Sequence, residues 1–223
     1  MKNKIDVKCY PELSRGSWAE KKLKELLQKL PNSTVSDIGA GFGWFGPIVK
    51  RNGLRWQAFD QIKKTEEIEV WDLNQPAPDF SSTPGLIVFL EVLEHLSNPQ
   101  EALRNITNHL CSGGYLIITT PNPFYSKSKF DIIFKNKFYA FQPKHLKEHH
   151  VFIPLPHVVE FHLNKMSLKL EEYAIIGKNN APKFSKTGNY FKAWTRYVCE
   201  ELISFGDKKA SGHTQAFLFR KDA

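Results

Sequence analysis

Short apolar runs and helical stripes alternate along most of the chain. Seven runs of mainly apolar residues are bounded by Gly, Pro, Asp or Ser, which is typical of buried strands. Between these runs, apolar residues recur at helical spacing, as expected of helices that cover a sheet. The alternation predicts an α/β fold with a seven-stranded, mostly parallel sheet and helices on both faces. The predicted strands are residues 35–38, 54–59, 68–71, 85–90, 115–120, 168–176 and 214–220.

Three helices are predicted from capping signals and apolar stripes. The first begins at Ser17, which forms a capping box with Glu20, and ends before Pro31. The second begins at Ser97, and the third follows Pro156. The inward faces carry Leu23, Leu26, Leu27 and Leu30 in the first helix, Ala102, Leu103, Ile106 and Leu110 in the second, and Val158, Val159, His162, Leu163 and Met166 in the third.

A glycine-rich turn follows the first predicted strand. Glycines at 39, 41 and 43 allow positive φ and let a ligand lie against bare backbone where a helix begins. Position 44, where a dinucleotide-binding fingerprint needs its third glycine, is Trp44. Asp37 adds negative charge beside the turn and disfavours a pyrophosphate. The turn therefore predicts a site for a cationic ligand, such as an ammonium or a sulfonium.

Acidic residues follow the next three strands. Asp60 lies 19 residues after Gly41, where a carboxylate can accept hydrogen bonds from a ribose diol. This order resembles class I S-adenosylmethionine (SAM) dependent methyltransferases, including ubiquinone-type and surface-glycan enzymes, over residues 30–176. The resemblance implies a Rossmann-like sheet whose last strand is antiparallel. It also implies a SAM site with Asp37, Gly39, Ala40, Gly41 and Phe42 at the methionine end, Asp60 at the ribose, Asp72 and Leu73 at the adenine, and Glu91 beside the sulfonium.

We expect one domain over residues 1–223, with a SAM-binding core at 30–122, a substrate lid at 123–153 and a basic insertion at 177–212. The formal net charge is +8, and residues 124–152 and 177–196 carry +4 and +5. Both segments follow predicted strands, so they meet at the carboxyl rim where ligands bind. This charge favours an anionic acceptor. The alternative is that the lysines are simply solvated.

Aromatic residues are interleaved with the lysines of the lid. Phe130, Ile133, Phe134 and Phe138 fall at helical spacing, so residues 129–139 are predicted to form a short amphipathic helix. We favour a helix that caps the site with its apolar face packed on the domain. Contact with a membrane surface and stacking on single-stranded nucleic acid are the alternatives.

Histidines are the candidates for a general base, which methyl transfer needs only when the acceptor is a hydroxyl. The resemblance assigns His149, three residues before Phe152, to a stretch that closes over the pocket. His95, His150 and His145 are the other candidates. We interpret two further histidines, His109 and His213, as surface residues, and place His157 and His162 on the third helix.

Glu91, Glu94 and His95 could share one helical face. With a later histidine they resemble the metal site of small-RNA terminal 2′-O-methyltransferases, and a basic surface would suit RNA. Metal-free methyltransferases carry the same pattern, and residues 144–149 only approximate the expected histidine run. We therefore expect no metal ion, with Glu94 stabilising its helix.

The three cysteines, Cys9, Cys111 and Cys199, are far apart and predict neither a disulfide framework nor a metal site. Without a signal peptide or a membrane span, we expect a cytoplasmic enzyme. The predicted reaction is methyl transfer from SAM to a hydroxyl of an anionic, lipid-linked or nucleotide-linked small molecule, such as a surface-polysaccharide sugar. The alternatives are a metal-dependent RNA 2′-O-methyltransferase and a catalytically silent SAM-binding regulatory module.

Overall fold

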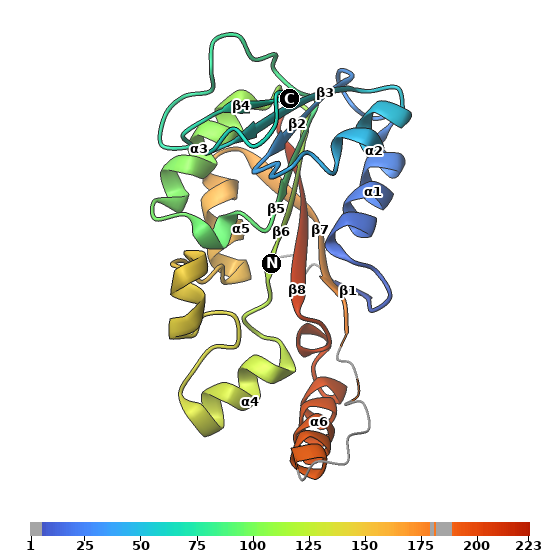
Figure 1. Ribbon diagram of the computed structural model, residues 1–223. Coiled ribbons are helices and arrows are strands. Elements are labelled where there is room, and N and C mark those ends of the chain that lie inside the picture. Colours follow the sequence, from blue (N-terminus) through green and yellow to red (C-terminus); the bar gives the residue numbers. More distant parts are fainter. Residues whose placement is uncertain (1–5, 179–180, 182–188) are drawn as a thin grey trace.

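The computed structural model describes residues 6–178, 181 and 189–223. Within them, one eight-stranded sheet has the order β1-β7-β8-β6-β5-β2-β3-β4 (Figure 1). β8 is antiparallel to both of its neighbours, and every other pair is parallel, as the sequence predicted. The strands are β1 (Val7–Tyr10), β2 (Thr34–Ile38), β3 (Arg55–Asp60), β4 (Ile68–Val70), β5 (Leu86–Leu90), β6 (Tyr115–Pro121), β7 (Leu168–Ile176) and β8 (Thr214–Lys221).

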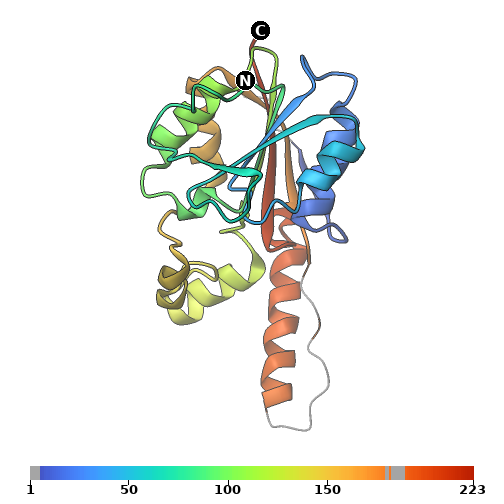
Figure 2. The ribbon, with the colours of Figure 1, turned by 45° about the horizontal axis from the view of Figure 1, so that its top comes forward.

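Helices cover both faces of the sheet and enclose two apolar cores (Figure 2). On one face α1 and α2 contribute side chains such as Leu23 and Val49. On the other face α3 and α5 contribute Ile106 and Leu163. The helices are α1 (Arg15–Leu26), α2 (Gly46–Arg51), α3 (Pro99–His109), α4 (Ser126–Lys135), α5 (Pro156–Lys165) and α6 (Asn189–Phe205), with short 3-10 turns η1 (Leu93–His95), η2 (Pro143–Glu148) and η3 (Lys208–Ala210).

Two helix starts differ from the predicted ones. The N-cap of α1 is Ser14, three residues before the predicted cap, because the Ser14 hydroxyl accepts a hydrogen bond from the Ser17 N–H and Ser17 completes the capping box. α3 begins at Pro99 with Asn98 as its N-cap, so Ser97 lies outside the helix. The apolar stripe of α3 was assigned correctly. In α1, Leu23 and Leu26 are buried as predicted, but the helix ends at Leu26, so Leu27 and Leu30 lie beyond it and are only partly buried.

β1 is the eighth strand, which the sequence did not predict. It has four residues and pairs in parallel with β7 at the edge of the sheet. None of its residues is fully buried, so its sequence lacks the apolar run that marks the central strands. The helix that follows Pro156 and the antiparallel hairpin of β7 and β8 agree with prediction.

The two predicted insertions lie together at one end of the molecule (Figures 1 and 2). The lid helix α4 is Ser126–Lys135 rather than 129–139, and Asn136 ends it in the left-handed conformation. The favoured prediction that its apolar face packs on the domain is wrong, because Ile133 and Phe134 are 69% and 68% exposed. The basic insertion contains α6, a helix that we did not predict, and residues 179–180 and 182–188 lie outside the described residues. None of the described helices combines the length and apolar character that crossing a bilayer requires.

Candidate functional site

The glycine loop after β2 is held against the end of β3. The N–H groups of Gly39 and Ala40 donate to the Phe59 carbonyl over 2.8 and 3.0 Å. The Gly41 N–H donates to Asp60 Oδ2 over 2.8 Å. Gly41 has φ +62°, and a Cβ built on it meets no described atom within 4 Å. Bare backbone therefore faces open space at this turn, as the sequence predicted.

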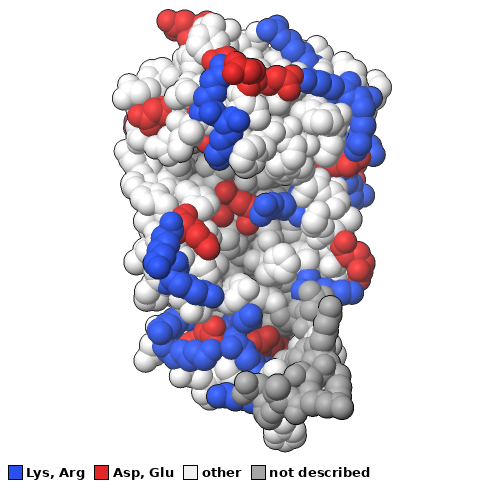
Figure 3. Space-filling view, in the orientation of Figure 1, with Lys and Arg blue, Asp and Glu red and all other residues white. Residues whose placement is uncertain are grey.

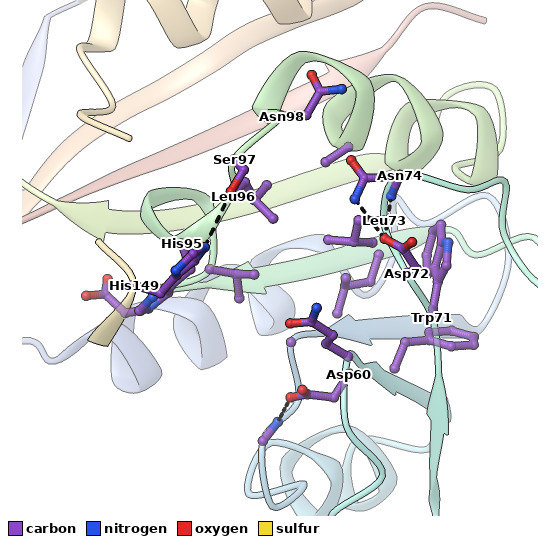
Figure 4. A pocket seen from close by; sticks show the side chains of 18 of the residues that line it. Asp60, Trp71, Asp72, Leu73, Asn74, His95, Leu96, Ser97, Asn98 and His149 are labelled. Atoms are coloured by element: carbon purple, nitrogen blue, oxygen red, sulfur yellow. Dashed lines mark hydrogen bonds between the residues drawn. The ribbon is translucent and has the colours of Figure 1, made fainter. Parts of the chain in front are cut away.

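This open space is a cavity of about 440 Å³ at the carboxyl ends of β2, β3, β4 and β5. Its size suits a nucleoside-sized ligand. In Figure 4, Asp60 and Asp72 lie on one side of the cavity, and Ser97, His95 and His149 lie on the other. The lining residues are Ile38, Gly39, Gly41, Phe59, Asp60, Gln61, Lys64, Trp71, Asp72, Leu73, Asn74, Glu91, Val92, His95, Leu96, Ser97, Asn98, Ala102 and His149.

Glu91 forms the inner end of the cavity, directly after β5. Its φ of 55° is in the left-handed region, which is strained for a residue with a side chain. Its Oε1 atom is buried and accepts no hydrogen bond from the described residues. The guanidinium of Arg15 lies 3.7 Å from the other oxygen, Oε2. Burial raises the pKa of Glu91, and Arg15 opposes that rise. An unpaired buried acceptor at the end of a cavity is a strong site for a donor on a ligand.

Six of the nine residues predicted to hold SAM line this cavity: Gly39, Gly41, Asp60, Asp72, Leu73 and Glu91. Asp37, Ala40 and Phe42 lie outside its wall. Asp37 is buried in β2, and the Trp56 indole N–H donates to it over 3.4 Å. Burial raises the pKa of Asp37 to about 7. Phe42 points into solvent, 78% exposed, and ligand contact by these three residues stays a prediction.

Four histidines surround the mouth of the cavity, and two of them, His95 and His149, line it. His149 Nε2 lies 3.4 Å from Ser97 Oγ. His95 Nδ1 lies 2.7 Å from the Glu148 carbonyl, and His150 Nδ1 lies 2.9 Å from the Ala140 carbonyl. His145 Nδ1 accepts a hydrogen bond from the Gln142 N–H. The structure therefore brings together all four histidines that the sequence predicted as candidate bases. His145 and His150 lie behind the two that line the cavity.

The lid segment is tied to the core beside these histidines. The N–H groups of Val151 and Phe152 both donate to the Glu94 carbonyl, over 3.0 and 3.1 Å. His149 itself adopts the left-handed conformation, with φ 59°. The turn that ends in Phe152 therefore holds His149 at the mouth of the cavity, as the resemblance implied.

Glu94, His95 and His150 could hold a divalent ion. One ligand atom from each lies within 4.8 Å of the other two. Both imidazoles direct Nδ1 at a backbone carbonyl, which leaves Nε2 available as a ligand. Burial lowers the pKa of both histidines and favours the neutral form that binds metals. Burial raises the pKa of Glu94 to about 8, and the Thr120 hydroxyl donates to its Oε2 atom.

Our interpretation of His109 as a surface residue is wrong. It is buried at the end of α3, with Nε2 at 3.0 Å from Ser36 Oγ, and the rings of Phe59 and Trp71 pack against it edge-on. Burial lowers its pKa to about 4. The signal was its position three residues after Ile106, on the inward stripe of α3. His213 is exposed, as expected.

Sequence reasoning did not select several cavity-lining residues because they belong to loops without a motif. Lys64 reaches Asp60 Oδ2 at 3.6 Å from the loop after β3. Ser97 and Asn98 precede α3; from the sequence, Ser97 was interpreted only as the start of that helix, and Asn98 was not considered. Asn74 and Trp71 follow β4 beside Asp72 (Figure 4).

A second cavity, of about 480 Å³, shares the wall residue Glu91 with the first. Its walls come from the end of β6, from the two insertions and from the start of β8. They include the side chains of Lys127 and Lys178, two tyrosines and a buried glutamate. The lining residues are Glu91, Pro121, Tyr125, Lys127, Tyr139, Ala140, Lys178, Glu200, His213 and Thr214.

The fold and the first cavity define a class I SAM-dependent methyltransferase. Solved structures with this fold include a SAM-dependent methyltransferase from Archaeoglobus fulgidus, with 18% identity and a TM-score of 0.57, covering 93% of this chain and 95% of that one. Another is the N-methyltransferase NodS from Bradyrhizobium japonicum in complex with S-adenosyl-L-homocysteine, with 16% identity and a TM-score of 0.54, covering 95% of this chain and 90% of that one.

The chain belongs to the methyltransferase domain family, whose model matches residues 13–159. A ubiquinone biosynthesis O-methyltransferase of Rickettsia prowazekii is 22% identical over 163 residues, which are 68% of this chain and 64% of that protein. The protein of the same name from Rickettsia typhi is 21% identical over 201 residues, 76% of this chain and 81% of that one. The chain thus spans just under two thirds of the first relative.

The residues of the first cavity fit SAM. The bare backbone at Gly41 leaves room for a ligand, and Asp60 presents a carboxylate beside it. Glu91, whose buried Oε1 atom has no partner among the described residues, lines the same cavity and offers an acceptor for a cationic group. SAM is therefore the cofactor of this site.

Proposed function

We propose that the protein transfers a methyl group from SAM to a hydroxyl of a small anionic molecule carried on a lipid or a nucleotide. A surface-polysaccharide sugar is the acceptor that we propose first. The observation that carries the proposal is the second cavity, which shares the wall residue Glu91 with the SAM cavity. The ubiquinone O-methyltransferases among its relatives support transfer to oxygen.

Two lysines in the walls of the second cavity support an acceptor with negative charge. Lys127 and Lys178 line the cavity beside the acidic Glu91 and Glu200. The Lys127 ammonium lies 4.3 Å from the centre of the Tyr139 ring, and the Lys178 ammonium pairs with Glu12 at 2.7 Å. Lysines also gather over the part of the surface that α4 and the lid form (Figure 3). Positive side chains at a cavity mouth raise the local concentration of anions and fix their orientation. Tyr125 and Tyr139 add flat apolar surface for a ring.

SAM supplies an electrophilic methyl group on a sulfonium. The protein must hold the acceptor oxygen in line with that methyl carbon and remove the hydroxyl proton as the new bond forms. We propose His149 as the base. Ser97 Oγ lies beside its Nε2 atom and would orient the ring, so that Nδ1 receives the proton. His95 is the second candidate, although its Nδ1 faces the Glu148 carbonyl.

Methyl-labelled SAM and two sets of hydroxyl acceptors test this function. One set carries sugars on nucleotide or lipid diphosphates, and the other consists of neutral phenols. We expect turnover with the charged set, and a KM about tenfold higher in Lys127→Gln and Lys178→Gln for that set alone. Turnover of neutral phenols with no response to the lysine changes would reject the anionic acceptor. SAM binding without a product from either set would favour a silent binding module.

We propose that the reaction takes place in the cytoplasm. No disulfide joins Cys9, Cys111 and Cys199 in the structure. Free thiols persist in reducing compartments. Detection of the protein in an oxidising compartment with mixed disulfides at Cys9 or Cys199, which are exposed, would contradict this placement.

The metal-dependent RNA 2′-O-methyltransferase is a second candidate because of the cluster of Glu94, His95 and His150. EDTA separates it from the first candidate. Methyl transfer that is unchanged by EDTA supports the first. Loss of RNA methylation in EDTA, its recovery on addition of Mn²⁺, and no recovery in His150→Ala would support the second.

A further inference from the structure

The insertion that contains α6 lies between β7 and β8, two strands that pair with each other up to their ends. β7 and β8 pair directly to their ends, with Ile176 opposite Thr214. The strand pairs of this hairpin therefore lie before and after the insertion. α6 projects from the sheet beside α4, at the end of the molecule opposite the chain's C-terminus (Figures 1 and 2).

The inner side of α6 is charged. Arg196 forms ion pairs with Glu200 at 2.6 Å and with Asp131 of α4 at 3.0 Å. Asp131 and Glu200 are both buried. The Arg196 guanidinium also lies 5.0 Å from the centre of the Phe130 ring. A helix of a globular protein normally presents its charged residues to solvent. In α6, Arg196 and Glu200 face the protein, while Lys192 and Glu201 are exposed.

The outer side of α6 is apolar and exposed. At 100° per residue, its five large apolar side chains fall within an arc of about 80°. Phe191, Leu202 and Phe205 are 77%, 70% and 95% exposed. The stripe runs the length of the helix, and Ile133 and Phe134 of α4 are exposed nearby in the same pair of insertions. The stripe consists of Phe191, Trp194, Val198, Leu202 and Phe205.

The charge around the stripe decides between its possible occupants. Residues 177–212 hold seven basic and three acidic residues, and residues 123–153 hold six lysines and two acidic residues. These two segments therefore account for the whole net charge of +8. A second copy of the chain would bring the same positive charge to the stripe and be repelled. An anionic lipid surface would attract it and cover the apolar side chains.

We propose that α6 docks on the surface of an anionic membrane, with the apolar stripe in the interfacial layer. Aromatic side chains such as Trp194 and Phe205 prefer that layer. Glu200 on the opposite side of α6 lines the second cavity, so docking would hold that cavity close to the lipid headgroups. Docking itself does not depend on methyl transfer, and its test needs neither SAM nor an acceptor.

Sedimentation of the full chain with vesicles tests the proposal. One set of vesicles is phosphatidylcholine, and the other is phosphatidylcholine mixed with phosphatidylglycerol. We expect binding to the mixed vesicles, weakened about tenfold by each of Phe191→Ser and Phe205→Ser because each removes one large apolar side chain. Phe80→Ser is the matched control, since Phe80 is 68% exposed on the loop between β4 and β5, and it should bind as the wild type does. SAM affinity reports that each variant remains folded.

Three results would overturn the proposal. The first is equal binding to both vesicle sets, and the second is no binding to either. The third is a concentration-dependent dimer in sedimentation velocity that Phe191→Ser dissociates, because it would identify a second copy as the occupant. Tryptophan fluorescence gives an independent test. Subtracting the emission spectrum of Trp194→Phe from that of the wild type gives the emission of Trp194, which should shift to shorter wavelength with the mixed vesicles only.

Discussion

The Gly41 N–H donates a hydrogen bond to the Asp60 carboxylate over 2.8 Å, at the point where β2 and β3 end side by side. This contact joins the glycine loop to the acidic residue that the sequence placed 19 positions later. It orients one Asp60 oxygen at the loop, and the whole carboxylate stays at the cavity wall. The same side chain thus shapes the loop and is available to a ligand.

Asp60→Ala should weaken SAM binding by about tenfold to a hundredfold, because a charge-assisted hydrogen bond contributes about 1.5 to 3 kcal/mol. Asp60→Asn keeps an acceptor for the Gly41 N–H and should lose less. Titration calorimetry with SAM and with its demethylated product measures both variants. Equal affinity in the wild type and Asp60→Ala would remove Asp60 from the site.

Gly39→Ala should destabilise the fold more than Gly53→Ala. Both glycines have φ +74°, so both variants meet the left-handed strain of about 1 to 2 kcal/mol. A Cβ at Gly39 would also lie 2.2 Å from Val92 Cγ2, whereas a Cβ at Gly53 meets no described atom within 4 Å. Urea unfolding compares the free energies of unfolding. The prediction is contradicted if the two variants lose the same amount.

His149→Ala should lower kcat by about a hundredfold to ten-thousandfold if His149 takes the acceptor proton. The affinity for SAM should change little, because the ring lies at the mouth of the cavity on the side opposite Asp60 and Asp72 (Figure 4). His157→Ala, on the exposed side of α5, is the control. Stopped assays at saturating SAM give kcat. An unchanged kcat would exclude His149 as the base and leave His95 as the next candidate.

His109 should make the fold less stable in acid. The folded pKa is about 4, below the ordinary value of 6.5, because the ring is buried. Between these values the unfolded chain binds a proton and the folded chain does not, so the free energy of unfolding falls as pH falls. The loss from this residue is about 2 to 3 kcal/mol over that range.

His109→Gln removes this proton uptake. The difference in free energy of unfolding between about pH 7 and about pH 5 should therefore be smaller in the variant than in the wild type. Urea unfolding at the two pH values measures it. Identical pH dependence in both proteins would mean that His109 binds its proton in the folded state as readily as in the unfolded chain.

The central part of the fold was predictable because its strands are buried on both faces. β5 and β6 read as continuous apolar runs, and each ends at polar residues that mark the carboxyl rim. The order of Gly41, Asp60 and Glu91 along the chain then placed the cavity, since the ends of parallel strands meet at one edge.

Features that depend on distant contacts were not predictable. β1 is recognisable only by its pairing with β7, which lies more than 160 residues later in the chain. α6 holds Arg196 against the protein, because Asp131 from another segment supplies its partner. The pairing of His109 with Ser36 likewise joins residues 73 positions apart. Local patterns contain no information about such partners.

The direct pairing of Ile176 with Thr214 places the two ends of the α6 insertion next to each other. Closing a longer or shorter loop between fixed ends costs little free energy, because the entropy depends only on the logarithm of loop length. This hairpin is thus a natural position for exchange of segments during evolution. A different segment between β7 and β8 could give a relative another acceptor or another location in the cell, while the nucleoside-binding half of the molecule stays unaltered.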